Sequence, residues 1–343
     1  MAKYGFLAVL ALTCTAFAPA KDDAPFAPVL EEDFADPFVM LHDGTFYAYA
    51  TNPPGNVANV QMATSTNLAD WALVKTGGKI HDAMPTLPVW AREGFTWAPE
   101  VQRVANGFVI YITAREKESG LQCIGAAFAS DPRGPFVSTE TEPMVCQRDL
   151  GGTIDAAPFR DTDGTLYLYY KNDGNNPKFG KPTDIYAQKM SPDGLKLEGP
   201  AVALLRNDKP WEAHVIEAPT MVKTPTGYAM FYSSNHYGWE THQRLSPYAM
   251  GWAKCDGPMG PCTDAPENPI LYSYNKRDVG CLSGPGHQSI FNVGARQFVS
   301  FHAWAATPGC RKLDNKRYLY VAPLLWKDGK PAVGVSIRPT AKK

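Results

Sequence analysis

Hydrophobic and polar residues alternate along five stretches of the chain, and each stretch has the layout of a β-hairpin. In residues 153–170 a short apolar run leads to Asp161-Thr-Asp-Gly164, and an alternating aromatic run then ends at Tyr170. An Asp-Gly pair between two such runs is a strong signal for a hairpin turn. The stretches with the same layout are residues 36–50, 97–112, 217–232 and 284–302. Helical periodicity never extends beyond a turn or two, so the pattern predicts an all-β fold.

The hairpins recur at nearly constant spacing. The prolines that lead them are 62, 59, 61 and 66 residues apart, at Pro37, Pro99, Pro158, Pro219 and Pro285. A turn glycine follows each proline, and a third and a weaker fourth strand follow each hairpin. Five units of four strands predict a five-bladed β-propeller, with four-stranded blades around a central channel. A β-sandwich is the alternative for a many-stranded chain, but the register shared by all five units argues against it.

The N-terminus has the pattern of a secretory signal peptide. Lys3 precedes an apolar run over residues 6–18, which is too short to span a membrane, and Ala18-Pro-Ala20 resembles a cleavage site. We therefore expect a signal peptide over residues 1–20, a single propeller domain over residues 21–343, and a secreted or periplasmic protein. Cys14 raises the alternative of a lipid anchor, but Thr13 is the wrong residue type before it.

Cysteine usage agrees with export. Six cysteines follow residue 20, an even number that indicates disulfides in an exported chain. The sequence alone does not choose the pairing, and the simplest one joins sequential neighbours: Cys123–Cys146, Cys255–Cys262 and Cys281–Cys310. The absence of CxxC spacing argues against a cysteine metal site. The formal net charge of -1 gives no electrostatic basis for binding nucleic acid or an anionic membrane.

Candidate chemistry lies where the first strand of each blade begins, because these strands line the channel of a propeller. Asp36, Asp155 and Glu217 stand at three of these positions, and His287 stands at a fourth. Each acid alone reads equally well as a turn or surface residue, but the shared register and apolar flanks favour a site. Grouped, partly buried carboxyls have pKa values that differ from one another, which is what acid/base chemistry needs.

The motifs at these positions resemble those of glycoside hydrolase family 43. The matching segments are Asp36-Pro37, Trp97-Ala-Pro-Glu100, Ile154-Asp155, Ile216-Glu-Ala-Pro219, Gly284-Pro-Gly-His287 and Phe301-His-Ala-Trp304. The resemblance covers essentially the whole chain after the signal and implies a five-bladed propeller that hydrolyses arabinose- or xylose-containing glycosides with inversion. It implies that Asp36 is the general base, that Glu217 is the general acid and that Asp155 raises the pKa of Glu217. One departure is Ala156-Ala157 before Pro158, where many members have proline directly after the Asp.

Further residues are candidates for contacts with substrate or metal. Trp97, Trp211, His214 and His302 are expected substrate-binding residues, with core packing or strand capping as the alternative; Trp239 and His242 flank the fourth blade in the same way. The resemblance implies a structural Ca²⁺ near His287, and no cofactor is expected for the chemistry itself. Residues 52–60 and 80–95 are expected to wall the pocket, which would favour cleavage at chain ends.

Together these features predict an exo-acting α-L-arabinofuranosidase. Its expected substrates are arabinan or arabinoxylan of the plant cell wall, and we expect a monomer that binds neither nucleic acid nor membrane. A β-xylosidase or an endo-arabinanase of the same family is the alternative. A sugar-binding propeller lectin is the alternative from another class, against which the three acids argue. An invertase-like fructosidase lacks support, because its Asn-Asp-Pro-Asn opening is absent at Asp36.

Overall fold

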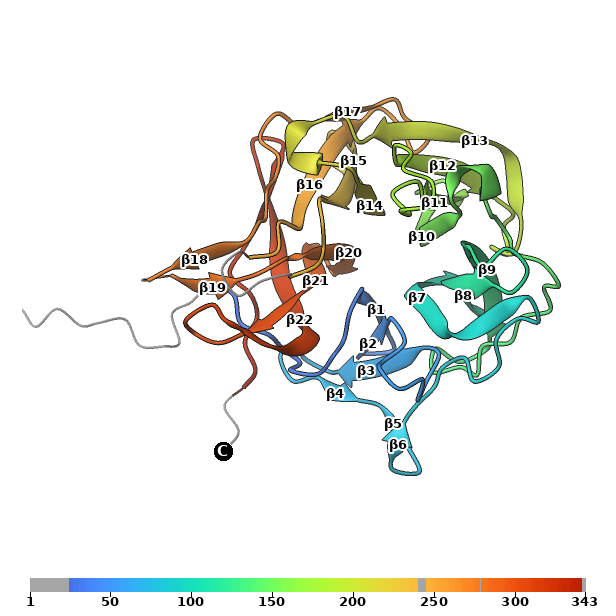
Figure 1. Cartoon of the computed structure of the whole chain (residues 1–343), viewed down its shortest axis with the longest axis horizontal. Coiled ribbons are helices and arrows are strands. Elements are labelled where there is room, and N and C mark those ends of the chain that lie inside the picture. Colours follow the sequence, from blue (N-terminus) through green and yellow to red (C-terminus); the bar gives the residue numbers. More distant parts are fainter. Residues whose placement is uncertain (1–24, 240–244, 278, 341–343) are drawn as a thin grey trace, which may run out of the picture.

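Five small antiparallel sheets form a ring around a central channel (Figure 1). The computed structural model describes residues 25–239, 245–277 and 279–340. Within each sheet the strands follow one another in sequence order, from the inner strand at the channel to the outer edge. This arrangement confirms the prediction of an all-β, five-bladed propeller. The predicted signal peptide over residues 1–20 lies outside the described residues.

The blades are built from strands that correspond to the five sequence repeats. Blade one contains β1 (Phe38–His42), β2 (Thr45–Ala50), β3 (Gln61–Ser65) and β4 (Ala72–Leu73). Blade two contains β7 (Ala91–Val104), β8 (Gly107–Glu116) and β9 (Gln122–Ala129). Blade three contains β10 (Thr153–Arg160), β11 (Leu166–Asn172), β12 (Asp184–Met190) and β13 (Leu197–Arg206). Blade four contains β14 (Ile216–Thr224), β15 (Gly227–Ser234), β16 (Ala249–Cys255) and β17 (Cys262–Asp264). Blade five contains β20 (Gly286–Val293), β21 (Arg296–Ala306), β22 (Lys312–Lys327) and β23 (Lys330–Val333).

Short elements connect and decorate the blades. In blade two, isolated bridges from β9 to Val137 and Val145 take the place of a fourth strand. The two small ribbons pair β5 (Lys75–Thr76) with β6 (Lys79–Ile80), and β18 (Tyr274–Lys276) with β19 (Gly280–Leu282). The 3₁₀ helices are η1 (Arg148–Leu150) and η2 (Pro210–Glu212). No helix in the described part of the chain combines the length and apolar character needed to cross a bilayer.

Apolar side chains fill the spaces between neighbouring blades. Met62 of blade one packs in one cluster with Ile112 of blade two, and Phe231 of blade four packs in another with Phe301 of blade five. Full burial of each such side chain contributes about 1.5–3 kcal/mol. Because the alternating strands present an apolar face to both neighbours, the inner strands are held in fixed positions around the channel.

The ring closes where the first blade meets the last. Leu30 pairs with Leu319 of β22, and the N–H of Val29 donates to the Leu319 carbonyl at 2.9 Å. In Figure 1 the blue blade one accordingly lies beside the red blade five. The chain segment before blade one therefore ties the two ends of the sequence together.

All three disulfides join sequential cysteines, which confirms the simplest pairing. Cys123 of β9 bonds Cys146, Cys255 bonds Cys262 across β16 and β17, and Cys281 of β19 bonds Cys310. The first two bridges tie the third strand of a blade to the segment that follows it, and the last ties the β18–β19 ribbon to the connection between β21 and β22.

A residue with left-handed backbone conformation lies near the start of the inner strand in four blades and within the longer β7 in blade two. Its φ is between 44° and 59° in Asp36, Ala98, Asp155, Ala218 and His287. The pairing of the inner strand shifts register at this residue in blades two to five. Such a bulge bends the strand and redirects the neighbouring side chains, here into the channel.

This conformation corrects the proline alignment of the repeats. The residue after the left-handed one is proline in blades one, two and four, but Ala156 in blade three and Gln288 in blade five. Pro158 instead lies within β10, paired with Leu168, because the bulge precedes it. Asp155 therefore occupies the same backbone position as Asp36, although no proline follows it, whereas Glu217 lies one residue earlier.

Candidate active site

A pocket of about 440 Å³ occupies one end of the channel. The residues predicted to be functional that line it are Asp36, Trp97, Asp155, Glu217, His287 and His302. They come from all five blades, because each inner strand or its neighbour contributes at the bulge. The structure therefore brings the three predicted carboxyls together in one pocket.

Asp36 is surrounded by cationic and hydrogen-bonding groups. Its Oδ1 lies 3.1 Å from Arg317 Nη1, 3.3 Å from His287 Nδ1 and 3.2 Å from His302 Nδ1. Burial alone would raise the pKa of Asp36, but the charge of Arg317 and the neighbouring His287 outweigh it and hold the pKa well below the usual range. Arg317 is the permanent charge among them, so we attribute most of the effect to it. Asp36 is accordingly ionised at any working pH.

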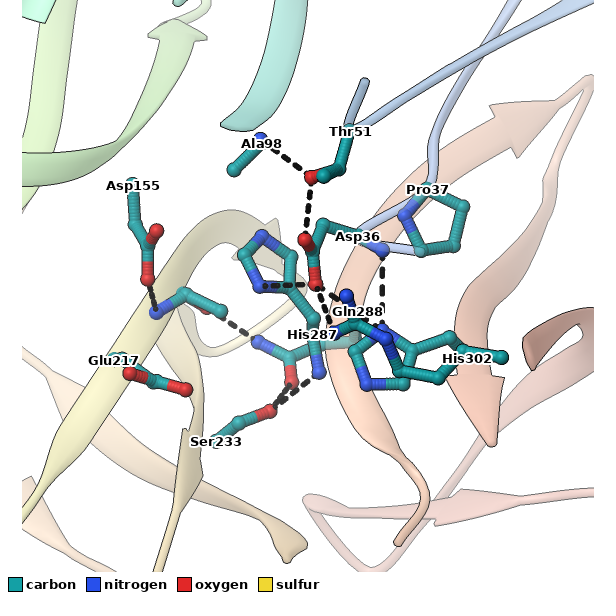
Figure 2. Close-up of polar contacts among 12 residues, drawn as sticks. Asp36, Pro37, Thr51, Ala98, Asp155, Glu217, Ser233, His287, Gln288 and His302 are labelled. Carbon is teal, nitrogen blue, oxygen red and sulfur yellow. Dashed lines mark hydrogen bonds and ion pairs between the residues drawn. The ribbon is translucent and has the colours of Figure 1, made fainter. Parts of the chain in front are cut away.

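A threonine links Asp36 to the next blade. The Thr51 hydroxyl donates to Asp36 Oδ2 and accepts a hydrogen bond from the backbone N–H of Ala98 at 3.0 Å (Figure 2). The orientation of the Asp36 carboxylate is thus fixed by bonds on both of its oxygens.

Glu217 has different surroundings. Tyr248 donates its hydroxyl hydrogen to Glu217 Oε1 at 2.7 Å, and Lys171 Nζ lies 3.4 Å from Oε2. The Glu217 side chain is 15% exposed, so it remains accessible from the pocket. Burial and the neighbouring Glu217 raise the pKa of Tyr248 well above its usual value, so the phenol stays protonated and acts as a donor.

Asp155 is more deeply buried and is bonded to the segment that carries Glu217. Its Oδ2 accepts the backbone N–H of Ala218 at 2.9 Å, a contact that Figure 2 shows between blades three and four. Burial and the nearby Glu217 raise the pKa of Asp155 to about 6, against the opposing effects of His287 and Lys171. Asp155 and Asp36 therefore share a backbone position but have opposite shifts in pKa.

His302 lies inside β21, not at its end as the sequence suggested. Burial, followed by the charge of Arg317, lowers its pKa to about 4, so the ring is neutral at neutral pH. Its Nδ1 accepts the backbone N–H of Asp36 at 3.1 Å, and its ring stacks on Tyr248 with centroids 5.9 Å apart. The ring is therefore part of the wall of the pocket and fixes the backbone of Asp36.

His287 was also expected to approach a calcium ion. Its Nδ1 faces Asp36, and its backbone N–H donates to Ser233 Oγ at 2.8 Å. Calcium prefers six to eight oxygen ligands, and the described side chains around His287 form no cluster of three or more metal-binding groups. The residues present therefore do not make a calcium cage by themselves. A cation at His287 stays a prediction.

Of the other residues predicted to bind substrate, only some of those that the structure describes line the pocket. Trp97 lines the pocket and is half-buried. Trp211 does not line it, because its ring packs against Tyr232 between blades three and four, with centroids 5.7 Å apart. His214 is exposed outside the pocket, in the segment after η2. Trp239 is buried and also does not line the pocket. His242 lies outside the described residues.

The prediction that residues 52–60 and 80–95 form the walls of the pocket was wrong. The described lining includes none of residues 52–60 or 80–95, and instead includes Asp173, Asn175, Asn176, Pro177 and Tyr237. These belong to the segment after β11 and to the segment after β15. The wall therefore comes from blades three and four, close to the pair of Asp155 and Glu217.

Four functional candidates were missed in the sequence. Arg317, Tyr248 and Lys171 contact the carboxyls of the pocket, but nothing in their local sequence distinguishes them from ordinary strand residues. Glu100 belongs to the motif Trp97-Ala-Pro-Glu100, which did not by itself indicate a role for it. Burial and then the charge of Asp155 raise the pKa of Glu100 well above its usual value.

Comparison with known proteins agrees with this geometry. The model of the family described as Glycosyl hydrolases family 43 matches residues 26–331. The chain belongs to glycoside hydrolase family 43. It is therefore a glycoside hydrolase, and its five-bladed propeller is the architecture of the related enzymes.

Several individual proteins are similar to this family 43 chain. Xylosidase/arabinosidase 43A of Humicola insolens is 30% identical over 139 residues, which span 38% of this chain and 41% of that protein. A structure described as a thermostable family-43 glycoside hydrolase is 30% identical, with a TM-score of 0.74 over 90% of this chain and 95% of that one. An endo-1,4-beta-xylanase structure from Bacteroides thetaiotaomicron is 26% identical, with a TM-score of 0.71 over 92% of this chain and 98% of that one.

Proposed function

We propose that this enzyme hydrolyses a glycosidic bond with inversion, with Asp36 as general base and Glu217 as general acid. The observation that carries the proposal is the contrast between the two carboxyl environments within one pocket. Arg317 keeps Asp36 ionised, as a base requires. Glu217 instead accepts the Tyr248 hydroxyl, interacts with the buried Asp155 carboxyl and stays partly exposed to the pocket, where an acid would meet the leaving group.

The reaction requires one water molecule and two proton transfers. Asp36 takes a proton from water as the water oxygen bonds to the anomeric carbon. The bond between that carbon and the leaving-group oxygen breaks, and Glu217 gives its proton to this oxygen. Asp36 ends protonated and Glu217 ends ionised, so exchange of protons with solvent restores the starting state.

For the substrate we propose terminal α-L-arabinofuranosyl groups of plant arabinan or arabinoxylan. The pocket lies at the end of the channel and is walled by residues 173–177 and Tyr237, which suits a chain end or a side-chain sugar. Trp97 offers an aromatic face for the ring. The Humicola relative is described as a xylosidase/arabinosidase, which supports the choice of a pentose.

A β-xylosidase is the second candidate. The 26% identical structure described as an endo-1,4-beta-xylanase favours a xylose-containing substrate. Tyr237, which lines the pocket and is 48% exposed, would meet the leaving group in either case.

We also propose that the enzyme acts outside the cytoplasm as a monomer. Its three disulfides are of the kind that persist in oxidising compartments, where polymeric plant substrates are met. A mass measurement in solution would test the oligomeric state.

The test of the proposed function combines a substrate panel with product stereochemistry. Nitrophenyl α-L-arabinofuranoside, nitrophenyl β-D-xyloside and linear arabinan separate the two exo activities from endo cleavage. Proton NMR of the first product then reports the anomer. We expect release of arabinose with inverted configuration. A first product that retains the configuration would contradict the assignment of Asp36 as base.

A further inference from the structure

One residue at an equivalent position beside the channel lies in the second strand of blades two to five and directly after the second strand of blade one. Each of these residues lies opposite the residue that comes just before the left-handed residue of its own blade. In blades two to five the two are strand partners. In blade one they are joined by the hydrogen bond from Thr51 N to Ala35 O. The five residues are Thr51, Thr113, Lys171, Ser233 and His302. Because they are related by the repeat, they can be compared directly.

Four of these five residues make the same contact. Each accepts the backbone N–H of the left-handed residue in the next blade around the ring. The contacts are Thr51 with Ala98 at 3.0 Å, Thr113 with Asp155 at 3.1 Å, Ser233 with His287 at 2.8 Å and His302 with Asp36 at 3.1 Å. This interblade hydrogen bond satisfies a backbone donor that the bulge removes from its own sheet.

Lys171 is the exception, because an ammonium group has no acceptor. The corresponding N–H, that of Ala218, is accepted by Asp155 Oδ2 at 2.9 Å. Asp155 has therefore taken over the structural contact in blade three, and the second-strand position is free to carry a cation. The exception falls at the blade boundary where Glu217 is located.

The ammonium group of Lys171 is directed at Glu217 and its surroundings. The Lys171 side chain is 0% exposed, and its Nζ lies 3.4 Å from Glu217 Oε2, 3.8 Å from Asp173 Oδ1 and 2.6 Å from Asn175 Oδ1. Burying a lysine without such partners is very unfavourable. Its interblade position therefore has a specific electrostatic role at Glu217.

We propose that Lys171 is a positioning residue for Glu217, a buried ammonium group that orients the Glu217 carboxyl and stabilises the negative charge formed when Glu217 gives up its proton. This inference rests on the proposed role of Glu217 as general acid. Lys171 Nζ lies 3.4 Å from Glu217 Oε2, so its positive charge contributes most in the transition state, where Glu217 becomes negative.

The groups that face Glu217 come from several elements. Lys171 extends from β11, Asp155 from β10 and Asp173 from the segment after β11, while Tyr248 precedes β16. His287 of β20 acts on Asp155 from the other side of the channel. Lys171 is the amine in this group, which otherwise consists of acids, a phenol and a histidine, so its removal has a defined direction of effect on Glu217.

The experiment compares Lys171→Met with wild type on two substrates that share the same sugar. A nitrophenyl glycoside has a leaving group that departs without much help from an acid, whereas the corresponding disaccharide requires the proton of Glu217. We expect kcat on the disaccharide to fall about 100-fold and kcat on the nitrophenyl glycoside to change far less. The basic limb of the pH profile should move to higher pH, because a cation that favours ionised Glu217 has been removed.

Two further variants keep the test decisive. Asn175→Ala removes a hydrogen-bond acceptor of Lys171 from a half-buried loop residue, so it should fold even if Lys171→Met does not, and should show a smaller loss with the same dependence on the leaving group. Lys223→Met is the matched control, because Lys223 bonds Thr162 and Tyr228 and does not line this pocket. It should leave kcat on both substrates near wild type.

The outcomes separate this inference from the proposed function. The role of Lys171 would be overturned if Lys171→Met lost equal activity on both substrates and kept an unchanged pH profile. If Lys171→Met does not fold, the same result in Asn175→Ala would overturn it. Wild-type kinetics in Lys171→Met would do the same. If Glu217→Gln retained wild-type turnover on the disaccharide, the acid assignment itself would fail. If Glu217→Gln lost activity but Lys171→Met showed wild-type kinetics or equal losses on both substrates, the proposed function would stand and only the role of Lys171 would fail.

Discussion

Asp155 Oδ2 accepts the backbone N–H of Ala218 at 2.9 Å, so the carboxylate expected to tune Glu217 is bonded to the peptide unit that follows Glu217. One side chain thus has two effects on the neighbouring acid. It fixes the backbone from which Glu217 projects, and its charge acts on the Glu217 carboxyl through the buried interior. The two effects can be separated by a substitution that keeps the acceptor and removes the charge.

Asp155→Asn makes that separation. Asparagine retains an oxygen for the Ala218 N–H, so the fold should persist, but the negative charge that interacts with the Glu217 carboxyl is lost. Because activity requires protonated Glu217, the basic limb of the kcat/KM profile should move to lower pH, opposite to the shift expected for Lys171→Met. Asp163→Asn in the exposed hairpin turn is the control. An unchanged basic limb in Asp155→Asn would show that its charge does not act on Glu217.

The two reacting carboxyls should be far more sensitive. Asp36→Asn and Glu217→Gln should each lower turnover of a disaccharide at least about 1000-fold, because each removes general acid or base assistance. Circular dichroism and thermal unfolding check that the fold is intact. Added azide, a nucleophile that needs no general base, should restore part of the activity of Asp36→Asn on a nitrophenyl glycoside if the sugar site remains functional. Near wild-type turnover in both variants would contradict the site assignment.

The features carried by the repeat could be predicted from the sequence. Each hairpin has its own turn and alternating strands, so residues 153–170 predicted β10 and β11 without knowledge of other blades. Asp36, Asp155 and Glu217 were placed in one pocket because a repeat makes equivalent positions converge. Proline was a poor guide to the exact register, because the bulge is defined by backbone conformation and not by the residue that follows it. In blade three that following residue is Ala156 instead of proline.

The other residues of the site depend on contacts between blades. Arg317 comes from the third strand of blade five and reaches Asp36 of blade one, and its local sequence resembles any charged strand residue. Trp211 looked like a sugar platform, but its place in η2 directs its ring into the packing between blades. Lys171 was detectable in principle, because it is the lysine at a repeat position otherwise occupied by Thr, Ser or His.

Arg317→Met should change the acidic limb of the pH profile, whereas Asp155→Asn should change the basic limb. Arg317 lies 3.1 Å from Asp36 and opposes the effect of burial, so its loss should raise the pKa of Asp36. A base must be ionised, so activity would be lost at a higher pH on the acidic side. KM should also rise, because Arg317 lines the pocket. Lys316→Met, at a partly exposed neighbouring cation, should leave the acidic limb in place. A shift in both variants would indicate a general charge effect.

A disulfide that closes a longer loop should stabilise the protein more, although only as the logarithm of the loop length. The sequence separation is 29 residues for Cys281–Cys310 and 7 for Cys255–Cys262. From loop entropy, replacing each pair with alanine should cost about 3.5 kcal/mol for the longer loop and about 2.5 kcal/mol for the shorter one. Urea unfolding of the two double variants measures the difference. A larger loss for the shorter loop would mean that loop entropy does not dominate.

Two adjacent buried serines test the interblade hydrogen bond itself. Ser233 Oγ accepts the N–H of His287 at 2.8 Å and donates to Gln288 Oε1 at 2.7 Å, whereas Ser234 Oγ donates to the Val215 carbonyl at 2.7 Å. Both side chains are fully buried, and both lie in β15. The substitutions Ser233→Ala and Ser234→Ala therefore remove the same atom from nearly the same environment.

Only Ser233→Ala leaves a buried N–H without its acceptor. The Val215 carbonyl keeps a second hydrogen bond from Asn235 N at 3.3 Å, so Ser234→Ala should cost about 1 kcal/mol. An orphaned buried donor adds about 1–3 kcal/mol, so Ser233→Ala should unfold at a clearly lower urea concentration. Since the orphaned N–H belongs to His287, which faces Asp36, Ser233→Ala should also lower kcat while Ser234→Ala leaves it unchanged. Equal unfolding midpoints for the two variants would show that the interblade bond does not hold the channel residues in place.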